Sequence, residues 1–315
     1  MKISFAEFEP PRPGTGGGAV VIGVWEDEVL TAPARQLDEA SGGAIGRALA
    51  ASPRFRGKRN ELVSVVGPAG LAVSRIVVAG LGKPEAADLR GLEDLAGTLV
   101  AHLNGVGEVA ATFAIDAMAA EKLSAAEVAA HLALGAALRA YRFDKYRTTE
   151  KPERKPSLKS LTIAGPGPAA ARRAYTDGAA TAEAVAFTRD LVSEPANTIY
   201  PETLAAAAAG LSSLGLDVEV LDEERMRSLG MGALLGVAQG SVRPPRLVVM
   251  RWNGGDDGAA PLAFIGKGVT FDTGGISIKP AAGMGEMKWD MAGAGVVIGL
   301  MRLLAARAAK VNAVG

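Results

Sequence analysis

The sequence predicts an α/β protein with two domains: a smaller N-terminal domain with a mixed sheet, and a second α/β domain. Three observations lead to this fold class. The chain has 315 residues, a length that fits two domains. Runs rich in β-branched residues alternate with helix-like stretches through both halves. A charged, proline-containing segment over 145–160 interrupts this alternation as a surface connection would.

Local sequence patterns in the N-terminal half predict the strands and helices of a mixed sheet. Ala19 to Trp25 is an apolar, β-rich run. The runs 62–66 and 74–78 flank Gly67-Pro68-Ala69-Gly70, which predicts a hairpin. Ser124 and Glu127 form a capping box that opens a helix reaching about Tyr141. Further patterns predict a helix over 89–103 and strands over 108–115 and 161–164.

The second half begins after one long predicted helix, from Pro168 to about Ser193, which ends before Pro195. Pro201 then suits the first position of an Ala-rich helix. Strands are expected over 217–221, 246–252 and 262–265, followed by a helix over 289–309 and a β-like run over 310–315. We therefore expect domains at 1–165 and 198–315, with a connecting helix within 166–197.

Composition excludes several kinds of chemistry. The chain has no cysteine, which removes disulfides, thiolate metal sites and cysteine nucleophiles. Its two histidines, His102 and His131, lie in Ala/Leu-rich helical stretches, where we expect structural roles. Lys+Arg and Asp+Glu both number 34, so no bulk positive field favours nucleic acid or an anionic membrane. Catalysis would depend on Asp, Glu, Lys, Ser, Thr or Tyr.

We expect a cytoplasmic protein with no membrane partner. The N-terminus, MKISFAEFEPPRP, lacks the apolar core of a secretory signal. The longest weakly polar run, Met291 to Met301, is shorter than the roughly 20 residues of a spanning helix.

The segment from 262 to 291 carries the candidate chemistry. An apolar strand runs into a loop dense in glycine and acidic residues, and α/β sheets bind ligands at such strand ends. Lys267, Asp272, Lys279 and Asp290 recur within it, with glycine bends that allow their side chains to converge. Two carboxylates and a neutral amine can hold divalent cations, while a second lysine stabilises a developing oxyanion. Ordinary solvated loop charges explain the spacing alone equally well.

The exact sequence of this segment favours the metal site over ordinary solvated loop charges. GKGVTFDTGGISIKP followed by MKWDM resembles the metal-binding region of the cytosolic leucyl aminopeptidase family, the M17 metallopeptidases. Further resemblance lies in YRFDKY at 141–146, EPAN at 194–197, GVAQGS at 236–241 and PPRL at 244–247. The first 140 residues agree only in general pattern, as expected for that family's variable, macro-like N-terminal domain.

The resemblance implies a metal-dependent aminopeptidase that releases N-terminal, Leu-type amino acids from peptides through water activated by two metals. By position in the motif, Lys267 and Asp290 resemble ligands of one cation, and Asp272 a carboxylate shared between both. Lys279 resembles the catalytic lysine. Met287, with Lys279 and Asp272, matches the residues that contact substrate. The implied cofactors are two divalent cations, Zn or Mn, with Mg or Co as alternatives, and the implied assembly is a homohexamer.

One departure from the family pattern matters. The remaining metal ligands and the catalytic arginine of the family lie in an Asn-Thr-Asp-Ala-Glu-Gly-Arg motif downstream of Asp290, which the 315 residues do not contain. We therefore expect a fragment with an incomplete catalytic domain, which by itself binds metals weakly and hydrolyses little or nothing.

Two other interpretations remain open. Glycines at Gly80-Leu81-Gly82 and Gly293-Ala294-Gly295 suggest dinucleotide binding, but their spacing departs from GxGxxG, so turn or packing roles are expected. The second is a non-catalytic assembly or regulatory protein that retains the fold and binds DNA. The basic stretch from Lys145 to Lys159 is its main support, and a solvated linker explains that stretch as well.

Overall fold

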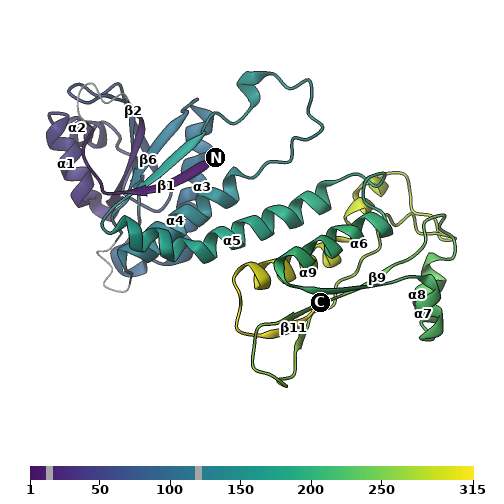
Figure 1. Ribbon diagram of the computed structural model, residues 1–315. Coiled ribbons are helices and arrows are strands. Elements are labelled where there is room, and N and C mark those ends of the chain that lie inside the picture. Colours follow the sequence, from purple (N-terminus) through teal and green to yellow (C-terminus); the bar gives the residue numbers. More distant parts are fainter. Residues whose placement is uncertain (12–16, 118–122) are drawn as a thin grey trace. The chain divides into compact units, whose positions relative to one another are not determined.

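The computed structural model describes residues 1–11, 17–117 and 123–315 and divides the chain into two compact units, Met1–Ala182 and Glu183–Gly315. The division falls inside α5 (Pro168–Ser193), the long helix predicted from the sequence. Figure 1 shows this helix in teal. Each unit contains its own sheet with helices, so the α/β class with two domains is confirmed. The finer limits 1–165, 166–197 and 198–315 stay predictions.

The first unit contains a seven-stranded mixed sheet in the order β1-β7-β6-β2-β5-β4, with β3 paired to β2. Neighbours from β1 through β5 are parallel, whereas β4 and β3 run antiparallel to their partners. The strands are β1 (Lys2–Ala6), β2 (Gly17–Trp25), β3 (Val29–Leu30), β4 (Leu62–Val66), β5 (Val73–Gly80), β6 (Ala110–Ala114) and β7 (Ser160–Ala164). The predicted hairpin is the β4–β5 pair, in which Val63 lies opposite Val78.

Helices cover both faces of this sheet, which explains why β2 is apolar without alternation. Val21 of β2 packs with α3 and α4 residues, while Ile22 packs with α1 and α2 residues. Figure 1 shows α1 and α2 near β2, away from α3 and α4. The helices are α1 (Ala32–Ala40), α2 (Ala44–Ala50), α3 (Leu89–Gly105) and α4 (Ala125–Ala140), with short 3-10 turns η1 (Glu26–Glu28), η2 (Pro84–Ala86) and η3 (Pro152–Arg154).

The second unit has a four-stranded sheet in the order β10-β11-β9-β8. The strands are β8 (Asp217–Leu221), β9 (Leu247–Asn253), β10 (Leu262–Ala263) and β11 (Asn312–Val314). Its helices are the end of α5, α6 (Pro201–Ala209), α7 (Glu223–Ser228), α8 (Gly232–Ala238) and α9 (Ala292–Ala306), with 3-10 turns η4 (Gly210–Leu214) and η5 (Met284–Trp289). β11 lies between β9 and β10, and Met250, Met291, Met301 and Ala313 form part of the core beneath it.

The strand predicted over 262–265 is shorter than expected, because pairing with β11 covers only Leu262 and Ala263. Ile265 lies almost fully exposed beyond this pair. The Phe264 N–H still donates to the Val314 carbonyl oxygen of β11 at 2.8 Å, so the chain leaves the sheet before Ile265, and the loop that carries the candidate site begins there.

One helical stretch, Met284–Ala306, is long and apolar enough by length and composition to cross a membrane. It joins η5 to α9 and exceeds the run Met291 to Met301 on which the prediction of no membrane span relied. Met291, Ile298 and Met301 are buried in the core of the second unit. Core helices of this kind pass the same length and composition test, so the stretch is weak support for a membrane span.

Both histidines have structural contacts in the first unit. His131 Nδ1 lies 2.6 Å from Glu93 Oε1 and joins α4 to α3. His102 Nε2 lies 3.3 Å from Ser64 Oγ. Burial, and secondly the positive charge of Arg75, lower the pKa of His102 from its ordinary 6.5.

The capping box gives a first testable prediction. Ser124 Oγ accepts a hydrogen bond from the Glu127 N–H at 3.2 Å, and Glu127 Oε2 accepts one from the Ser124 N–H at 2.9 Å. Ser124→Ala removes the acceptor at the first turn of α4 and should lower the free energy of unfolding by about 1 kcal/mol. Urea denaturation followed by circular dichroism measures this loss. Thr98→Ala, which removes an exposed hydroxyl from the middle of α3, serves as the control.

His102 gives a pH prediction. Because its folded pKa is lowered, the unfolded chain binds the proton more readily, so the stability contributed by neutral His102 is lost as pH falls below about 6.5. His102→Gln cannot titrate, and its urea midpoint should fall less between pH 7.5 and pH 5.5 than that of the unchanged protein. Equal falls in the two proteins would contradict this explanation.

Candidate functional site

The candidate site is the loop and 3-10 turn between β10 and α9, and its backbone is held by close glycine contacts. Gly274 has a φ of +90°, and a Cβ there would lie 2.2 Å from the Ser277 carbonyl oxygen. Gly266 and Gly293 let the loop pack against the start of α9, where the Ala294 N–H donates to the Lys267 carbonyl oxygen at 2.8 Å. Gly293 therefore has the packing role that was expected for it.

The structure brings the four predicted charged residues together as two lysine–aspartate pairs. Lys267 Nζ lies 2.8 Å from Asp290 Oδ1, and Lys279 Nζ lies 2.5 Å from Asp272 Oδ2. The two pairs also interact electrostatically, since the charge of Asp272 raises the pKa of Lys267 and the charge of Lys267 lowers the pKa of Asp272. The side chains of Asp272 and Lys279 are each 32% exposed, whereas Lys267 is 60% exposed. All four therefore belong to one electrostatic cluster that water reaches.

Local hydrogen bonds orient Asp272 and Lys279. The Gly274 N–H donates to Asp272 Oδ1 at 2.8 Å, which leaves Oδ2 for the lysine. The Lys279 N–H donates to the Thr273 carbonyl oxygen at 2.8 Å and closes the intervening turn. Hydrogen bonds from Lys279 and from the Gly274 N–H lower the pKa of Asp272. Asp272 therefore stays a carboxylate, as a metal ligand must.

Lys267 and Asp290 form the second pair. The hydrogen bond to Asp290, followed by the negative charges of Asp290 and Asp272, raises the pKa of Lys267. Asp290 Oδ2 is buried and has no hydrogen-bond partner among the residues that the structure describes. An unsatisfied buried carboxylate oxygen is costly in a protein and fits a cation ligand. The carboxylate oxygens of Asp290 and Asp272 are donors that could hold Zn or Mn, and a lysine amine such as that of Lys267 can bind a metal only when it is neutral.

Met287 lies beside the proposed catalytic lysine. Its Sδ is 3.2 Å from Lys279 Nζ, so it borders the same space as Lys279 and Asp272. Met287 comes from η5, which Gly283 begins with a φ of +79°. The structure therefore places the candidate substrate contacts Met287, Lys279 and Asp272 next to one another.

Sequence reasoning did not single out Lys288. Its Nζ donates to the Ser193 carbonyl oxygen at 3.1 Å and ties η5 to the end of α5. Its position between Met287 and Asp290 is the only sequence signal, because the partner is a backbone oxygen distant in the chain. Within the described ranges 1–11, 17–117 and 123–315, no group of three or more His, Cys, Asp or Glu side chains is placed to hold a metal ion.

Comparisons with known proteins show which family both parts of this chain resemble. The sequence profile of the catalytic domain of the cytosol aminopeptidase family matches residues 186–315, and that of its N-terminal domain matches residues 21–150. A protein of Caulobacter vibrioides named probable cytosol aminopeptidase is 48% identical over 318 aligned positions, which cover 100% of this chain and 62% of that protein. A protein of the same name from Rhodopseudomonas palustris is 44% identical and is covered to 62%.

Two solved structures share the fold. A variant of tomato leucine aminopeptidase superposes with a TM-score of 0.78 at 26% identity, over 99% of this chain and 61% of that one. The bottromycin maturation enzyme BotP in complex with Mn gives a TM-score of 0.72 at 27% identity, over 94% and 58%. The chain thus spans about three fifths of the length of the curated relatives described here. With both of its parts matched by the profiles of one family, the chain belongs to the cytosol aminopeptidase family.

Proposed function

We propose that this chain carries part of the active site of a metal-dependent aminopeptidase, which removes apolar, Leu-type residues from the N-termini of peptides. The observation that supports it most is the pairing of Lys267 with Asp290 and of Lys279 with Asp272 in one cluster beside Met287. Family membership gives this cluster its chemical interpretation. The relatives' name, cytosol aminopeptidase, supports the hydrolytic class and a cytoplasmic location.

Lys267, Asp272 and Asp290 are the residues proposed to hold two divalent cations, Zn or Mn. Asp290 Oδ2, which no described residue contacts by a hydrogen bond, and the ionised Asp272 fit this role. Bound divalent cations would supply Lewis-acid activation of water and of the scissile carbonyl. Lys267 can contribute its lone pair only after losing the proton that it shares with Asp290 in this structure, so metal binding and deprotonation of Lys267 are coupled.

Lys279 is proposed to stay protonated and to stabilise charge on the oxygen of the scissile carbonyl. Asp272 holds the ammonium group by one of its three N–H bonds, and Met287 Sδ accepts a second. The third N–H bond is the one proposed to donate to the carbonyl oxygen of the substrate. A fixed ammonium group aimed at a developing negative charge lowers the barrier without reorganising during the reaction.

Met287 is proposed to line the pocket for the side chain of the N-terminal residue. A thioether is apolar and adapts to branched aliphatic groups, which favours Leu over a charged residue. Peptides are therefore the proposed substrates. The formal net charge of zero gives no support for nucleic acid as a partner. By resemblance to the family, we propose a homohexamer as the assembly.

We further propose that these 315 residues alone bind metal weakly and hydrolyse peptides slowly. Lys267, Asp272 and Asp290 are three candidate ligands, whereas a catalytic zinc ion alone takes about three protein ligands, so two ions need more. The non-catalytic alternative of an assembly or regulatory role gains from the same observation, and activity measurements separate the two.

Metal binding gives the first prediction here. Mn²⁺ titrated into the 315-residue chain and followed by electron paramagnetic resonance should bind weakly, and Asp290→Asn should weaken it further by roughly tenfold or more. Asp290 supplies the unpartnered oxygen, so its neutralisation removes a ligand. Asp257→Asn changes an exposed aspartate of the loop before β10 and is the matched control. Equal Mn²⁺ binding by Asp290→Asn and the unchanged chain would contradict the assignment of Asp290.

Catalysis gives the second prediction of the proposed function. Release of leucine from Leu-Gly-Gly at high protein concentration with excess Mn²⁺ should be slow and should stop on chelation. Lys279→Gln should lower it by about 10²-fold, or to the chelated background, since it removes one donor to the developing oxyanion. Arg307→Gln, at the end of α9, is the charge-matched control. Rapid turnover by the unchanged chain would refute the proposal that these residues alone are slow.

A further inference from the structure

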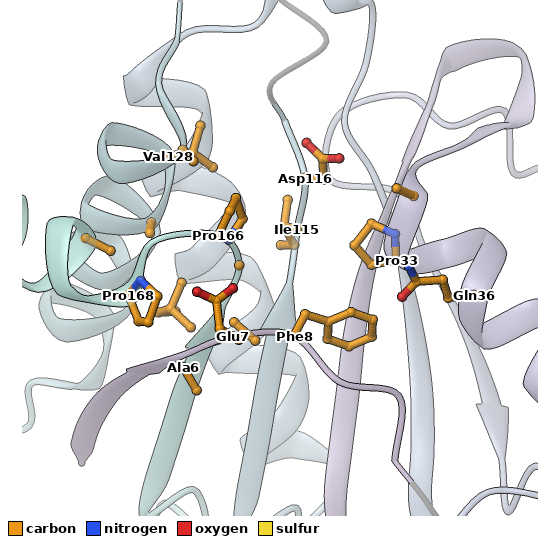
Figure 2. A pocket seen from close by; sticks show the side chains of 17 residues that line it. Ala6, Glu7, Phe8, Pro33, Gln36, Ile115, Asp116, Val128, Pro166 and Pro168 are labelled. Atoms are coloured by element: carbon orange, nitrogen blue, oxygen red, sulfur yellow. The ribbon is translucent and has the colours of Figure 1, made fainter.

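The first unit has a hollow at one edge of its sheet, apart from the hollow that Figure 2 shows. The one in Figure 2 is bordered by Glu7, Ile115 and Pro166, at the carboxyl ends of β1, β6 and β7. The other, of about 570 Å³, lies beside the start of β4 and is lined in part by Phe55 and Leu62. The two hollows share no residue, so the space beside β4 is a separate surface of this unit.

The strand β4 has one side of its backbone directed away from the sheet. In the described part of the chain, β5 is the only strand that pairs with β4. The Gly67 N–H donates to the Ser74 carbonyl oxygen of β5 at 2.9 Å. In an antiparallel pair, residues that bond the neighbouring strand alternate with residues that do not. Leu62, Ser64 and Val66 therefore direct their N–H and C=O groups outward from the sheet.

β4 lacks the features that usually keep an edge strand from pairing further. Its five residues, LVSVV, include no charged residue and no proline. Native edge strands commonly carry a lysine, a proline or a bulge that blocks another strand. The edge strand β8 of the second unit, for comparison, carries Asp217 and Glu219, which both pair with Arg251. Val66 of β4 is apolar and yet 66% exposed, so this edge is an uncovered apolar surface.

The charges next to this edge do not oppose a second strand. Arg75 of β5 lies opposite Val66, and its Nε is 3.3 Å from Glu108 Oε1. Arg75 and Glu108 are mostly buried, with side chains 16% and 10% exposed. Their charges neutralise each other, so the exposed end of β4 carries no net charge from this pair.

A second copy of β4 matches the edge in antiparallel register. The strand has five residues, and its central residue, Ser64, is one of those directed outward. Full overlap of two copies places Ser64 opposite Ser64 and Leu62 opposite Val66. Every outward N–H and C=O group of one copy then meets an outward group of the other. Since the strand is uncharged, no like charges meet across the pair, and apolar side chains lie opposite each other.

We propose that the β4 edge is an interface between two copies of this chain, which pair antiparallel about a two-fold axis at Ser64 and join their sheets into one. An extended polypeptide is the partner that matches alternating N–H and C=O groups along a sheet edge. The contact uses the same surface of both copies, so it closes at two copies instead of growing into a fibre. It belongs to the first unit and rests neither on the proposed metal site nor on the proposed homohexamer.

Disulfide crosslinking tests the register, because the chain has no cysteine of its own. In the proposed pair, the two Cα atoms of residue 64 lie about 5.5 Å apart, a distance that a disulfide spans. The two Cα atoms of residue 66 are separated by four residues along the strands, roughly 14 Å, which is too far. Under mild oxidation, Ser64→Cys should form disulfide-linked dimers on a non-reducing gel, whereas Val66→Cys should stay monomeric.

Val66→Cys is the matched control, because position 66 is more exposed than position 64 and random collisions would link it more readily. A mixture of Leu62→Cys and Val66→Cys chains should form the mixed dimer, since these residues lie opposite each other in the proposed register. The pattern reports this contact in an assembly of any size, so it is independent of the homohexamer. Crosslinks at 66 as readily as at 64, or at neither position, would overturn the proposal.

Removal of one outward N–H tests the backbone contact without a thiol. Val66→Pro lacks the N–H that points away from β5, so it keeps the bonds between β4 and β5 but loses one bond from each copy across the proposed pair. Sedimentation equilibrium should show reversible dimers of the unchanged chain, and Val66→Pro should raise their Kd by roughly tenfold or more.

Val66→Thr keeps the N–H and the branched Cβ, and its Kd should stay close to that of the unchanged chain. Circular dichroism checks that both variants remain folded. A monomer at every protein concentration, or equal association of folded Val66→Pro and the unchanged chain, would refute the proposal.

Discussion

The candidate site depends on the mutual neutralisation of two lysines and two aspartates in a segment with little regular secondary structure. Lys267 contacts Asp290 across a sequence separation of 23 residues, and Lys279 contacts Asp272 across 7. Like charges brought this close would repel, so each pair stabilises the turn that creates it. The glycines at 266, 274 and 293 allow the approach, because a side chain at any of them would collide with backbone atoms.

This pairing also explains how one cluster can serve two chemical roles. Asp290 has a buried oxygen with no partner in the described part of the chain, which suits cation binding. Asp272 uses one oxygen for a backbone N–H and the other for Lys279. The two lysines differ in surroundings as well. Lys279 has Asp272 and a thioether as neighbours, while Lys267 is more exposed and is bound to Asp290. Residues of the same type thus have different hydrogen-bond partners, which supports the different roles proposed for them.

The fold of the first unit depends on a different constraint, which is that its parallel strands are buried on both faces of the sheet. Ile22 and Phe113 are fully buried on opposite faces of neighbouring strands, which forces helices onto each side. The charged cluster of the second unit instead depends on the single segment between β10 and α9.

The sequence alone determined elements whose signal is local. The capping box at Ser124, the β4–β5 hairpin and the long helix α5 are present as predicted, because hydroxyl caps, glycine turns and proline boundaries act over a few residues. The four charged residues were also identifiable, since they lie in one motif. Tertiary structure decided the rest: β1 pairs with β7, whose residues are far along the chain, and β10 ends where β11 stops covering it. It also decided which lysine contacts which aspartate, because no local pattern encodes that pairing.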